Sequence, residues 1–261
     1  MWLARELLRY VRACGYQVDL FLQVCARGHH SWKRRDEVSN QLYLAGIKVV
    51  HVVLLVGLFV GMVVALQTGI ELARYGQQDQ IGTIVAVSMA REMGPFITAI
   101  ILAATVGSAL AAELGTMAVS EELAALEVLS VDRISYLVLP RMVALSIICP
   151  LLTVLCDAVG IFGGAFVAQA QLQVGLQLYF DSAVEALQDQ AVLIPLPKDV
   201  YSGLAKSFVF GVVVAVISCS AGIRASGGAL GVGDATRRAV RDSIITVIIF
   251  NYFMTWIFYQ S

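Results

Sequence analysis

The residues best suited to chemistry are charged side chains inside long apolar stretches. Arg91 and Glu92 are adjacent and lie about ten residues into the stretch from Ile81 to Ala111. A charge in such a place is costly and usually faces a cavity, a partner or another polar group. We expect Arg91 to attract a lipid phosphate and Glu92 to tune or gate that site. An ion-pair network between helices is the structural alternative.

The backbone around this pair carries its own signal. Adjacent residues on a helix point about 100° apart, so Arg91 and Glu92 are not expected to pair with each other. Gly94 and Pro95 follow at once. Proline removes a backbone donor and clashes with the preceding turn, which predicts a kink and a carbonyl freed toward a polar interior.

Two further charges lie deep in apolar stretches. Asp157 stands among glycines that let helices approach closely, and we expect it to make a satisfied interhelical hydrogen bond. Lys206 is expected either to extend to the lipid headgroups or to line the mouth of a cavity. With Tyr75, Arg91 and Glu92, Lys206 completes the set of candidate lipid-binding residues.

Signals for catalysis are missing. The chain has no G-x-x-x-x-G-K-[ST] phosphate loop and no Ser/His/Asp arrangement. Its three histidines lack metal-ligand spacing, and its five cysteines form no C-x-x-C pair. We therefore expect no catalytic residue, no metal and no cofactor in this chain, so the energy for any work must come from another protein.

The composition is that of an integral membrane protein. Hydrophobic residues make up 59% of the chain and charged residues 14%, with a mean hydropathy of +0.79. The first apolar run long enough to cross a bilayer begins near Ile47, beyond a basic leader, and no cleavable signal peptide is expected.

Five apolar stretches approach or exceed the roughly 20 residues that cross a bilayer core. We expect a single all-α membrane domain, 1–261, without internal repeats. Its predicted spans are 45–68, 80–111, 137–169, 200–223 and 238–259.

Residues 1–35 predict an amphipathic helix followed by a basic cluster. The apolar stripe is Leu3, Leu7, Val11, Cys14, Val18, Phe21, Leu22 and Cys25. Arginines lie opposite this stripe, which is typical of a helix in the plane of the lipid headgroups. A cytosolic helix packed on a partner is the alternative.

Basic residues set the expected orientation, because cytoplasmic loops hold the excess of arginine and lysine. Seven precede the first span: Arg5, Arg9, Arg12, Arg27, Lys33, Arg34 and Arg35. The N-terminus, residues 111–141 and residues 224–241 are therefore expected in the cytoplasm, and the C-terminus outside. The polar segment 171–192 predicts a short extracytoplasmic helix.

A polar island at 111–141 separates the second and third spans. Ser120 is a helix-capping residue type, and Glu121 and Glu122 follow it where the helix dipole favours acids. Leu123, Leu126 and Leu129 recur at roughly helical spacing. We expect a short amphipathic helix within 113–130 that docks on another protein; a plain connecting loop is the alternative.

Several motifs resemble the MlaE (YrbE-type) permease family, the membrane subunits of ABC transporters that move phospholipids between bacterial membranes. The similar stretches are A-E-L-G-T-M at 112–117, S-E-E-L-A-A-L-E-V-L at 120–129 with V-D-x-I-x-Y-L-V-x-P-R ending at 141, R-E-M-G-P at 91–95, A-K-S-F-V-F-G at 205–211 and G-V-G-D-A-T-R-R-A-V-R-D-S at 231–243. Arg133 stands where the family usually has proline.

The resemblance implies an assembly. It comprises a homodimer in the bacterial inner membrane, phospholipid as substrate, an ABC ATPase on the cytoplasmic side that binds ATP and Mg, and a periplasmic MCE-domain protein. No nucleic-acid partner is expected. The candidate ATPase-coupling residues are Glu113, Gly115, Thr116, Met117, Glu121, Glu122, Leu123, Leu126 and Glu127.

Two other classes of function fit part of the pattern. An ion-coupled secondary transporter would also have deep charges and a proline-kinked helix, although the repeated halves common in such folds are not seen. A non-transporting membrane scaffold would explain a docking helix but leaves Arg91 and Glu92 without a role.

Overall fold

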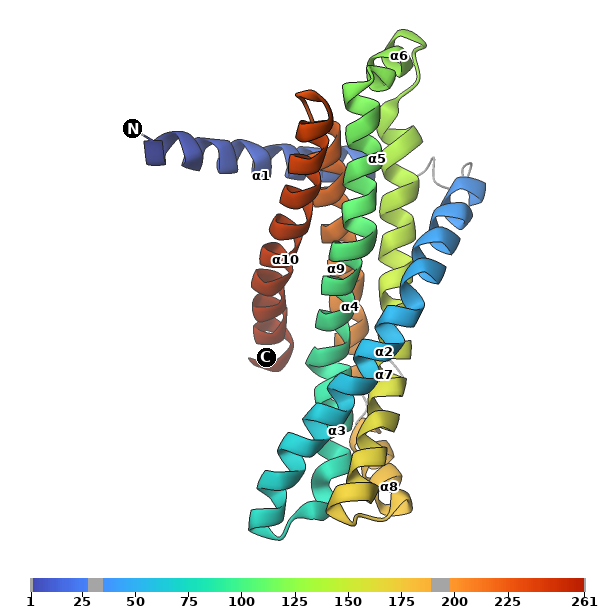
Figure 1. The fold of residues 1–261 in the computed structure, drawn as a ribbon, viewed down its shortest axis with the longest axis vertical. Coiled ribbons are helices and arrows are strands. Elements are labelled where there is room, and N and C mark those ends of the chain that lie inside the picture. The colour runs from blue at the N-terminus through green and yellow to red at the C-terminus, as the bar shows by residue number, and fades with distance from the viewer. Residues whose placement is uncertain (1, 28–34, 189–197, 261) are drawn as a thin grey trace. The chain divides into compact units, whose positions relative to one another are not determined.

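The computed structural model describes residues 2–27, 35–188 and 198–260. Within these ranges the chain is helical and contains no strand (Figure 1). Five helical runs are long and apolar enough to cross a membrane: Arg35–Tyr75, Gln78–Val119, Ile134–Leu172, Lys198–Ile223 and Gly228–Tyr259. An N-terminal helix precedes them, and a short helix separates the second run from the third. The expected fold class is therefore confirmed.

The chain forms two compact units. The first contains Met1–Ala45, Leu102–Ile147 and Gly211–Val247. The second contains Gly46–Ile101, Ile148–Phe210 and Ile248–Ser261. Segments of the long helices α2 (Arg35–Tyr75), α7 (Leu139–Leu172), α9 (Lys198–Ile223) and α10 (Gly228–Gln260) belong to each unit.

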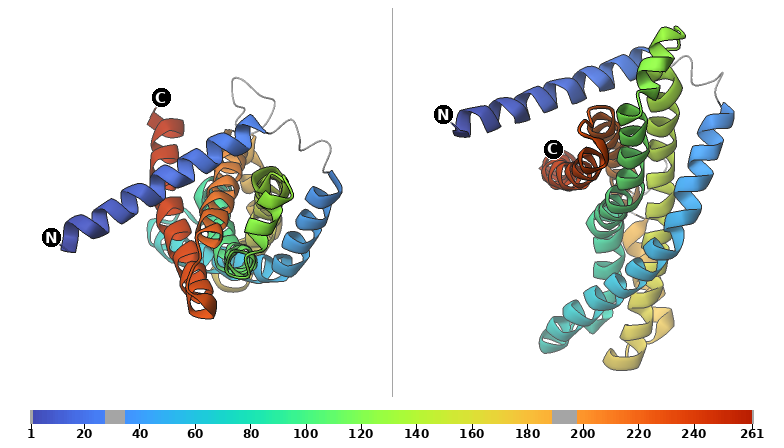
Figure 2. Two further views of the ribbon diagram at one scale, coloured as in Figure 1. Left: turned by 90° about the horizontal axis from the view of Figure 1, so that it is seen from above. Right: turned by 45° about the horizontal axis from the view of Figure 1, so that its top comes forward.

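The first unit holds the elements around the polar island. They are α1 (Trp2–Ala26), η4 (Ala103–Gly107), α5 (Ser108–Val119), α6 (Glu122–Val128) and η5 (Ile134–Val138), with parts of the long helices. Helix α1 packs against η5 and runs crosswise to α5 (Figure 2). Leu20 and Val24, one turn apart on α1, are fully buried and fix this contact.

The second unit holds η2 (Gln78–Gln80), α3 (Ile81–Ser88), η3 (Met89–Met93), α4 (Gly94–Leu102) and α8 (Leu176–Leu187), again with parts of the long helices. Helix α8 packs against α3. The Tyr179 hydroxyl donates to the Ile161 carbonyl at 3.1 Å, and the Thr83 hydroxyl donates to the Ser182 carbonyl at 3.1 Å. The short helix expected within 171–192 is thus present over 176–187, while 189–192 lie outside the described residues.

The second span is interrupted by two π-helical segments, η3 and η4. The first directly precedes Gly94 and Pro95, where the sequence predicts a kink. Pro95 has no N–H to give to the Arg91 carbonyl one turn earlier, so the regular ladder cannot continue there. A π-helical turn widens the helix by one residue and is often found at functional sites.

Glycines bring α2 and α7 together. A side-chain carbon added at Gly61 would collide with the backbone of Gly160, and one added at Gly163 would collide with the carbonyl of Leu58. Gly57 similarly faces Cys156. The G-x-x-x-G spacing of Gly57 and Gly61 is a weak signal in a chain with 22 glycines, yet both glycines are needed at this close approach.

We predict that Gly61→Ala destabilises the protein by about 1–3 kcal/mol, because the added methyl group meets backbone atoms that cannot rotate away. Thermal unfolding of the purified protein in mild detergent measures the effect. Gly233→Ala is the matched control, since a carbon added there meets no described atom within 4 Å other than its own neighbours and helix backbone. Equal unfolding temperatures for Gly61→Ala and the unmodified protein would contradict the prediction.

Candidate functional site

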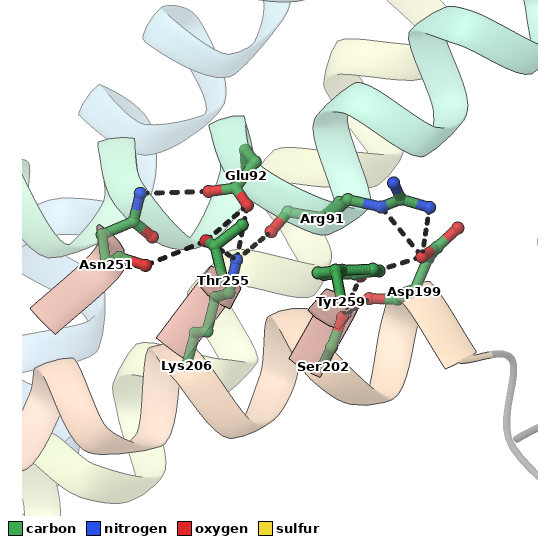
Figure 3. Close-up of polar contacts among 8 residues, drawn as sticks. All are labelled: Arg91, Glu92, Asp199, Ser202, Lys206, Asn251, Thr255 and Tyr259. Carbon is green, nitrogen blue, oxygen red and sulfur yellow. Dashed lines mark hydrogen bonds and ion pairs between the residues drawn. The ribbon is translucent and has the colours of Figure 1, made fainter. Parts of the chain in front are cut away.

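The deep charges of the second span lie in a polar cluster within the second unit (Figure 3). Three short stretches of helix supply it: η3, the start of α9 and the end of α10. The members are Arg91, Glu92, Asp199, Ser202, Lys206, Asn251, Thr255 and Tyr259.

Lys206 is the centre of the first half of the cluster. Its ammonium group donates to a carboxylate oxygen of Glu92 at 2.6 Å, to the Thr255 hydroxyl at 2.8 Å and to the Arg91 carbonyl at 3.1 Å. That carbonyl lacks its ordinary helical donor because Pro95 stands one turn later. The side chain of Lys206 is fully buried, and its three N–H donors all have acceptors.

Glu92 receives donors on both carboxylate oxygens. Besides Lys206, the Thr255 hydroxyl lies 2.8 Å from Oε1. The Asn251 amide donates to Oε2 at 3.0 Å. Two residues of α10 and one of α9 therefore hold this carboxylate, which compensates for removing its charge from bulk water.

Arg91 organises the second half of the cluster. Its Nε and Nη2 atoms lie 3.0 and 2.8 Å from one carboxylate oxygen of Asp199. The ring of Tyr259 lies beneath the guanidinium at 4.2 Å, and its hydroxyl donates to the same oxygen of Asp199 at 2.9 Å. Ser202 lies 2.6 Å from that hydroxyl. The Arg91 side chain remains 37% exposed.

This geometry revises the sequence-based hypotheses. Arg91 and Glu92 do take part in an interhelical ion-pair network, with separate partners, as the structural alternative supposed. The expectation that Lys206 extends to headgroups or lines a cavity mouth is wrong, because its ammonium group is buried against Glu92. Tyr75, at the exposed end of α2, takes no part in the hydrogen bonds of Figure 3.

The chemical capacity of the cluster lies with Arg91. Among the residues drawn in Figure 3, Nη1 of Arg91 donates to none. A partly exposed guanidinium with donors left over can bind a phosphate or carboxylate bidentately. Among the described residues, no group of three His, Cys, Asp or Glu side chains is placed to hold a metal ion.

Five members of the cluster were not predicted from the sequence to belong to the site. Asn251, Thr255 and Tyr259 recur every four residues, so they form one polar stripe along an apolar helix. That periodicity is the signal that could have found them. Asp199 and Ser202 precede Lys206 at helical spacing, but their partners depend on which helices meet.

Asp157 differs from its expectation. Its Oδ1 atom is buried against Gly94 and has no hydrogen-bond partner among the described residues. The satisfied interhelical hydrogen bond predicted for Asp157 is therefore not present at this oxygen.

The polar island folds into a short helix, but the helix begins later than the sequence suggests. Ser120 follows the last residue of α5, and its N–H donates to the Thr116 carbonyl at 2.9 Å. Glu121 then adopts a left-handed conformation with φ of 62°, which turns the chain, and α6 begins at Glu122. The expectation that Ser120 caps this helix at its start is wrong for that reason.

Exposure divides the candidate coupling residues. Leu123 is buried within the chain and Leu126 is half-buried, while Glu121, Glu122 and Glu127 are exposed. The largest exposed apolar side chains here are Val128 and Leu129, which are 85% and 71% exposed. Sequence spacing missed Val128 because it falls outside the leucine stripe.

The candidates that precede Ser120 form the base of the island. Glu113 accepts from the buried guanidinium of Arg141 at 3.1 Å, which joins α5 to α7. Gly115 packs against Val232 of α10. Thr116 is exposed and Met117 half-buried.

Comparison with known proteins decides the family. The family model described as "Permease MlaE" matches residues 38–257. The chain belongs to the MlaE permease family. The resemblance of its motifs to that family is thereby confirmed.

Relatives of this MlaE-family permease occur in bacteria and in plants. It is 38% identical over 227 residues to "Probable ABC transporter permease protein slr1045" of Synechocystis, which covers 87% of this chain and 83% of the relative. It is 38% identical over 223 residues to a "Probable ABC transporter permease protein" of Rickettsia bellii, with 85% and 83% covered.

A plant relative is similar over nearly the whole chain. "Protein TRIGALACTOSYLDIACYLGLYCEROL 1, chloroplastic" of Arabidopsis thaliana is 40% identical over 235 residues, which is 90% of this chain. The match spans 64% of the Arabidopsis protein, less than two thirds of its length. Family membership and the five long apolar helices together make this chain a multi-pass membrane permease.

We predict that Lys206→Met destabilises the permease by about 3 kcal/mol, because the charge of Glu92 would lose its buried partner. Adding Glu92→Gln to Lys206→Met should recover much of this loss, since the remaining group is neutral. Thermal unfolding in detergent measures both. Lys48→Met is the control, because Lys48 is exposed on α2. Additive losses from Lys206→Met and Glu92→Gln would refute the coupling.

Proposed function

We propose that this chain is the permease subunit of an ABC transporter that moves phospholipids between the inner and outer membranes of a bacterium. The observation that carries the proposal is the Arg91 guanidinium. Asp199 and Tyr259 hold it inside a membrane-spanning run, and it is still partly exposed. A cation maintained there at the cost of desolvation is suited to an anionic, membrane-soluble substrate.

A phospholipid meets both requirements, since it combines an anionic phosphate with apolar chains. The name of the Arabidopsis relative refers to trigalactosyldiacylglycerol, a lipid, which supports a lipid substrate here. In this proposal Arg91 binds the phosphate. Glu92 keeps Lys206 neutralised, so that the phosphate is drawn to Arg91 alone.

Energy comes from a second protein in this proposal. The chain has no phosphate loop, and the bacterial relatives are named as ABC transporter permeases. An ATPase subunit that binds ATP and Mg would dock on α6 from the cytoplasm. Val128 and Leu129 would enter an apolar groove of the ATPase, and Glu121, Glu122 and Glu127 would meet basic groups around it.

The position of α6 in the chain supports a coupling role. It connects α5, the end of the second span, to η5, the start of the third. Closure of the ATPase on ATP would displace residues 113–129 and with them α5. The second span also carries η3, so a movement at α6 would be passed along one helical run to Arg91 and Glu92.

Helix α1 supports a position at the cytoplasmic membrane surface. Val11, Cys14, Val18, Leu22 and Cys25 of the predicted apolar stripe are all exposed. Exposed apolar residues on one face of a helix would be covered by lipid if α1 lies among the headgroups. The N-terminus is then cytoplasmic and the C-terminus periplasmic.

The remaining parts of the proposed assembly follow from the family. Two copies of this permease would enclose the lipid between them, and an MCE-domain protein on the periplasmic side would receive or deliver it. ATP hydrolysis would take place in the ATPase, and the permease itself would catalyse no reaction.

We predict that the double variant Val128→Glu, Leu129→Glu loses its ATPase. Two charges buried in an apolar groove would reduce the amount of co-purified ATPase at least tenfold. This corresponds to a loss of about 1.4 kcal/mol or more of binding free energy. Quantitative pull-down from membranes solubilised in mild detergent measures this. Reversing charge with Glu121→Lys, Glu122→Lys should act in the same direction.

The control for this experiment is Val184→Glu, an exposed apolar position on α8 that the proposal places on the opposite side of the membrane. It should leave ATPase binding unchanged. Docking at α6 would be refuted if both double variants, at Val128/Leu129 and at Glu121/Glu122, still bound the ATPase at full stoichiometry.

We also predict that Arg91→Ala lowers co-purified phospholipid and ATP-dependent lipid transfer by about tenfold, the effect of losing one charge-assisted contact. Mass spectrometry of bound lipid and transfer between vesicles measure the two quantities. Arg74→Ala, at an exposed ion pair with Glu71, is the control. Unchanged lipid occupancy would remove Arg91 from the site, and transfer without any ATPase would favour an ion-coupled transporter.

A further inference from the structure

Helix α1 has a second face that packs on protein. Tyr16, Leu20, Val24 and Arg27 recur three or four residues apart, so they share one side of the helix. Leu20 and Val24 are fully buried, and α1 packs against η5. The exposed stripe that includes Val18 and Leu22 is a separate set of residues. One side of α1 is therefore fixed to the chain while another stays open.

Asp132 joins α1 to the third span. Its Oδ2 atom lies 2.6 Å from Nε of Arg27, just beyond α1, and accepts from the Ser135 hydroxyl at 2.7 Å. Its Oδ1 atom accepts from the N–H of Ile134 at 3.2 Å. The carboxylate thus caps the start of η5 and holds the end of α1 at the same time.

This carboxylate is ionised at neutral pH. Burial alone would raise the pKa of Asp132, but the hydrogen bonds from Ser135 and Ile134 and the charge of Arg27 together lower it below its ordinary value. The pair with Arg27 therefore persists throughout the neutral range.

The same turn is tied to α6. The N–H of Val131 donates to the Leu126 carbonyl at 2.9 Å, and Arg133 forms a 2.7 Å ion pair with Glu127. Asp132 stands between these two residues. An unbroken series of contacts thus runs from α6 through Asp132 to Arg27, all within the first unit.

A second contact holds α1 to the turn that follows α9. The guanidinium of Arg224 lies 5.5 Å from the ring of Tyr16. With Leu20 and Val24 buried between these two polar contacts, the second half of α1 is attached to the first unit at several points.

We propose that Asp132 is a positioning residue that couples α6 to α1, so that displacement of α6 also displaces α1 at the membrane surface. This inference rests on the proposed docking of an ATPase on α6. Asp132 acts through Arg27 and the start of η5, and touches neither lipid nor nucleotide. Its loss should leave ATP hydrolysis intact and reduce the lipid moved per ATP.

The experiment uses the full chain in complex with its ATPase, reconstituted in phosphatidylethanolamine and phosphatidylglycerol vesicles. The measured quantity is the number of headgroup-labelled phospholipids transferred per ATP hydrolysed. We expect Arg27→Gln and Asp132→Asn each to lower this ratio about two- to fivefold, the range for a half-exposed ion pair. The amide of Asp132→Asn can still cap η5, which keeps the fold.

The double variant is the decisive comparison. Because both side chains act through one contact, Arg27→Gln with Asp132→Asn should lower the ratio no further than either change alone. Arg27→Lys, which keeps the charge, should retain most of the coupling. Arg12→Gln removes the same charge from an exposed position on α1 and reports the effect of lost headgroup attraction alone.

Each outcome separates the two proposals. Hydrogen exchange of residues 127–136 is measured without ATPase and should speed up in Arg27→Gln but not in Arg12→Gln. Unchanged exchange, an unchanged transfer ratio, or additive losses in the double variant would overturn the role of Asp132 while leaving the transporter intact. A wild-type chain that binds no ATPase would overturn the proposed function, whatever the exchange shows.

Discussion

The structure of the second unit depends on giving hydrogen-bond acceptors to the ammonium group of Lys206, whose side chain is fully buried. An unpaired charge in a membrane-spanning helix costs at least several kcal/mol, so its neighbours must meet it with acceptors in good geometry. Glu92 supplies the opposite charge, and Thr255 supplies a hydroxyl. The third acceptor is the Arg91 carbonyl, which is available because Pro95 cannot donate to it. A proline that disrupts one helix thereby creates the acceptor that another helix needs.

Close helix approach is the condition for these contacts. A side-chain carbon at Gly203 of α9 would collide with the carbonyl of Ala90 in η3, so only glycine lets α9 come near enough for Lys206, one turn later, to reach Glu92. Gly94 plays the same part toward Asp157 of α7. The glycines and the buried charges therefore act together: small residues alone would give contact without specificity, and the charges alone would be too far apart to pair.

The sequence predicted those features that depend on local order and missed those that depend on which helices meet. Hydropathy located the five spans, and Pro95 predicted the distortion found at η3. Arg91 and Glu92 were recognised as important because charges are rare in such runs. Their partners Asp199 and Asn251 come more than 100 residues later, and nothing local links them. Likewise, the left-handed conformation of Glu121 moves the start of α6 one residue later than Ser120 as a cap would place it, and capping preferences do not reveal this.

The two cations of the cluster serve different ends, and their hydrogen-bonding capacity explains why one is lysine and the other arginine. Lysine has three donors, and Lys206 uses them all on protein, which makes it a structural connection among η3, α9 and α10. Arginine has five donors in a planar fork, so Asp199 can hold Arg91 through Nε and Nη2 and Tyr259 can stack on it, while Nη1 donates to none of the residues drawn in Figure 3. An arginine in place of Lys206 would bury a guanidinium that needs more acceptors than the site offers. A lysine in place of Arg91 would have a single ammonium group for both Asp199 and an incoming anion. The buried lysine thus stabilises the fold, while the partly exposed arginine beside it is the cation that the proposed lipid site would use.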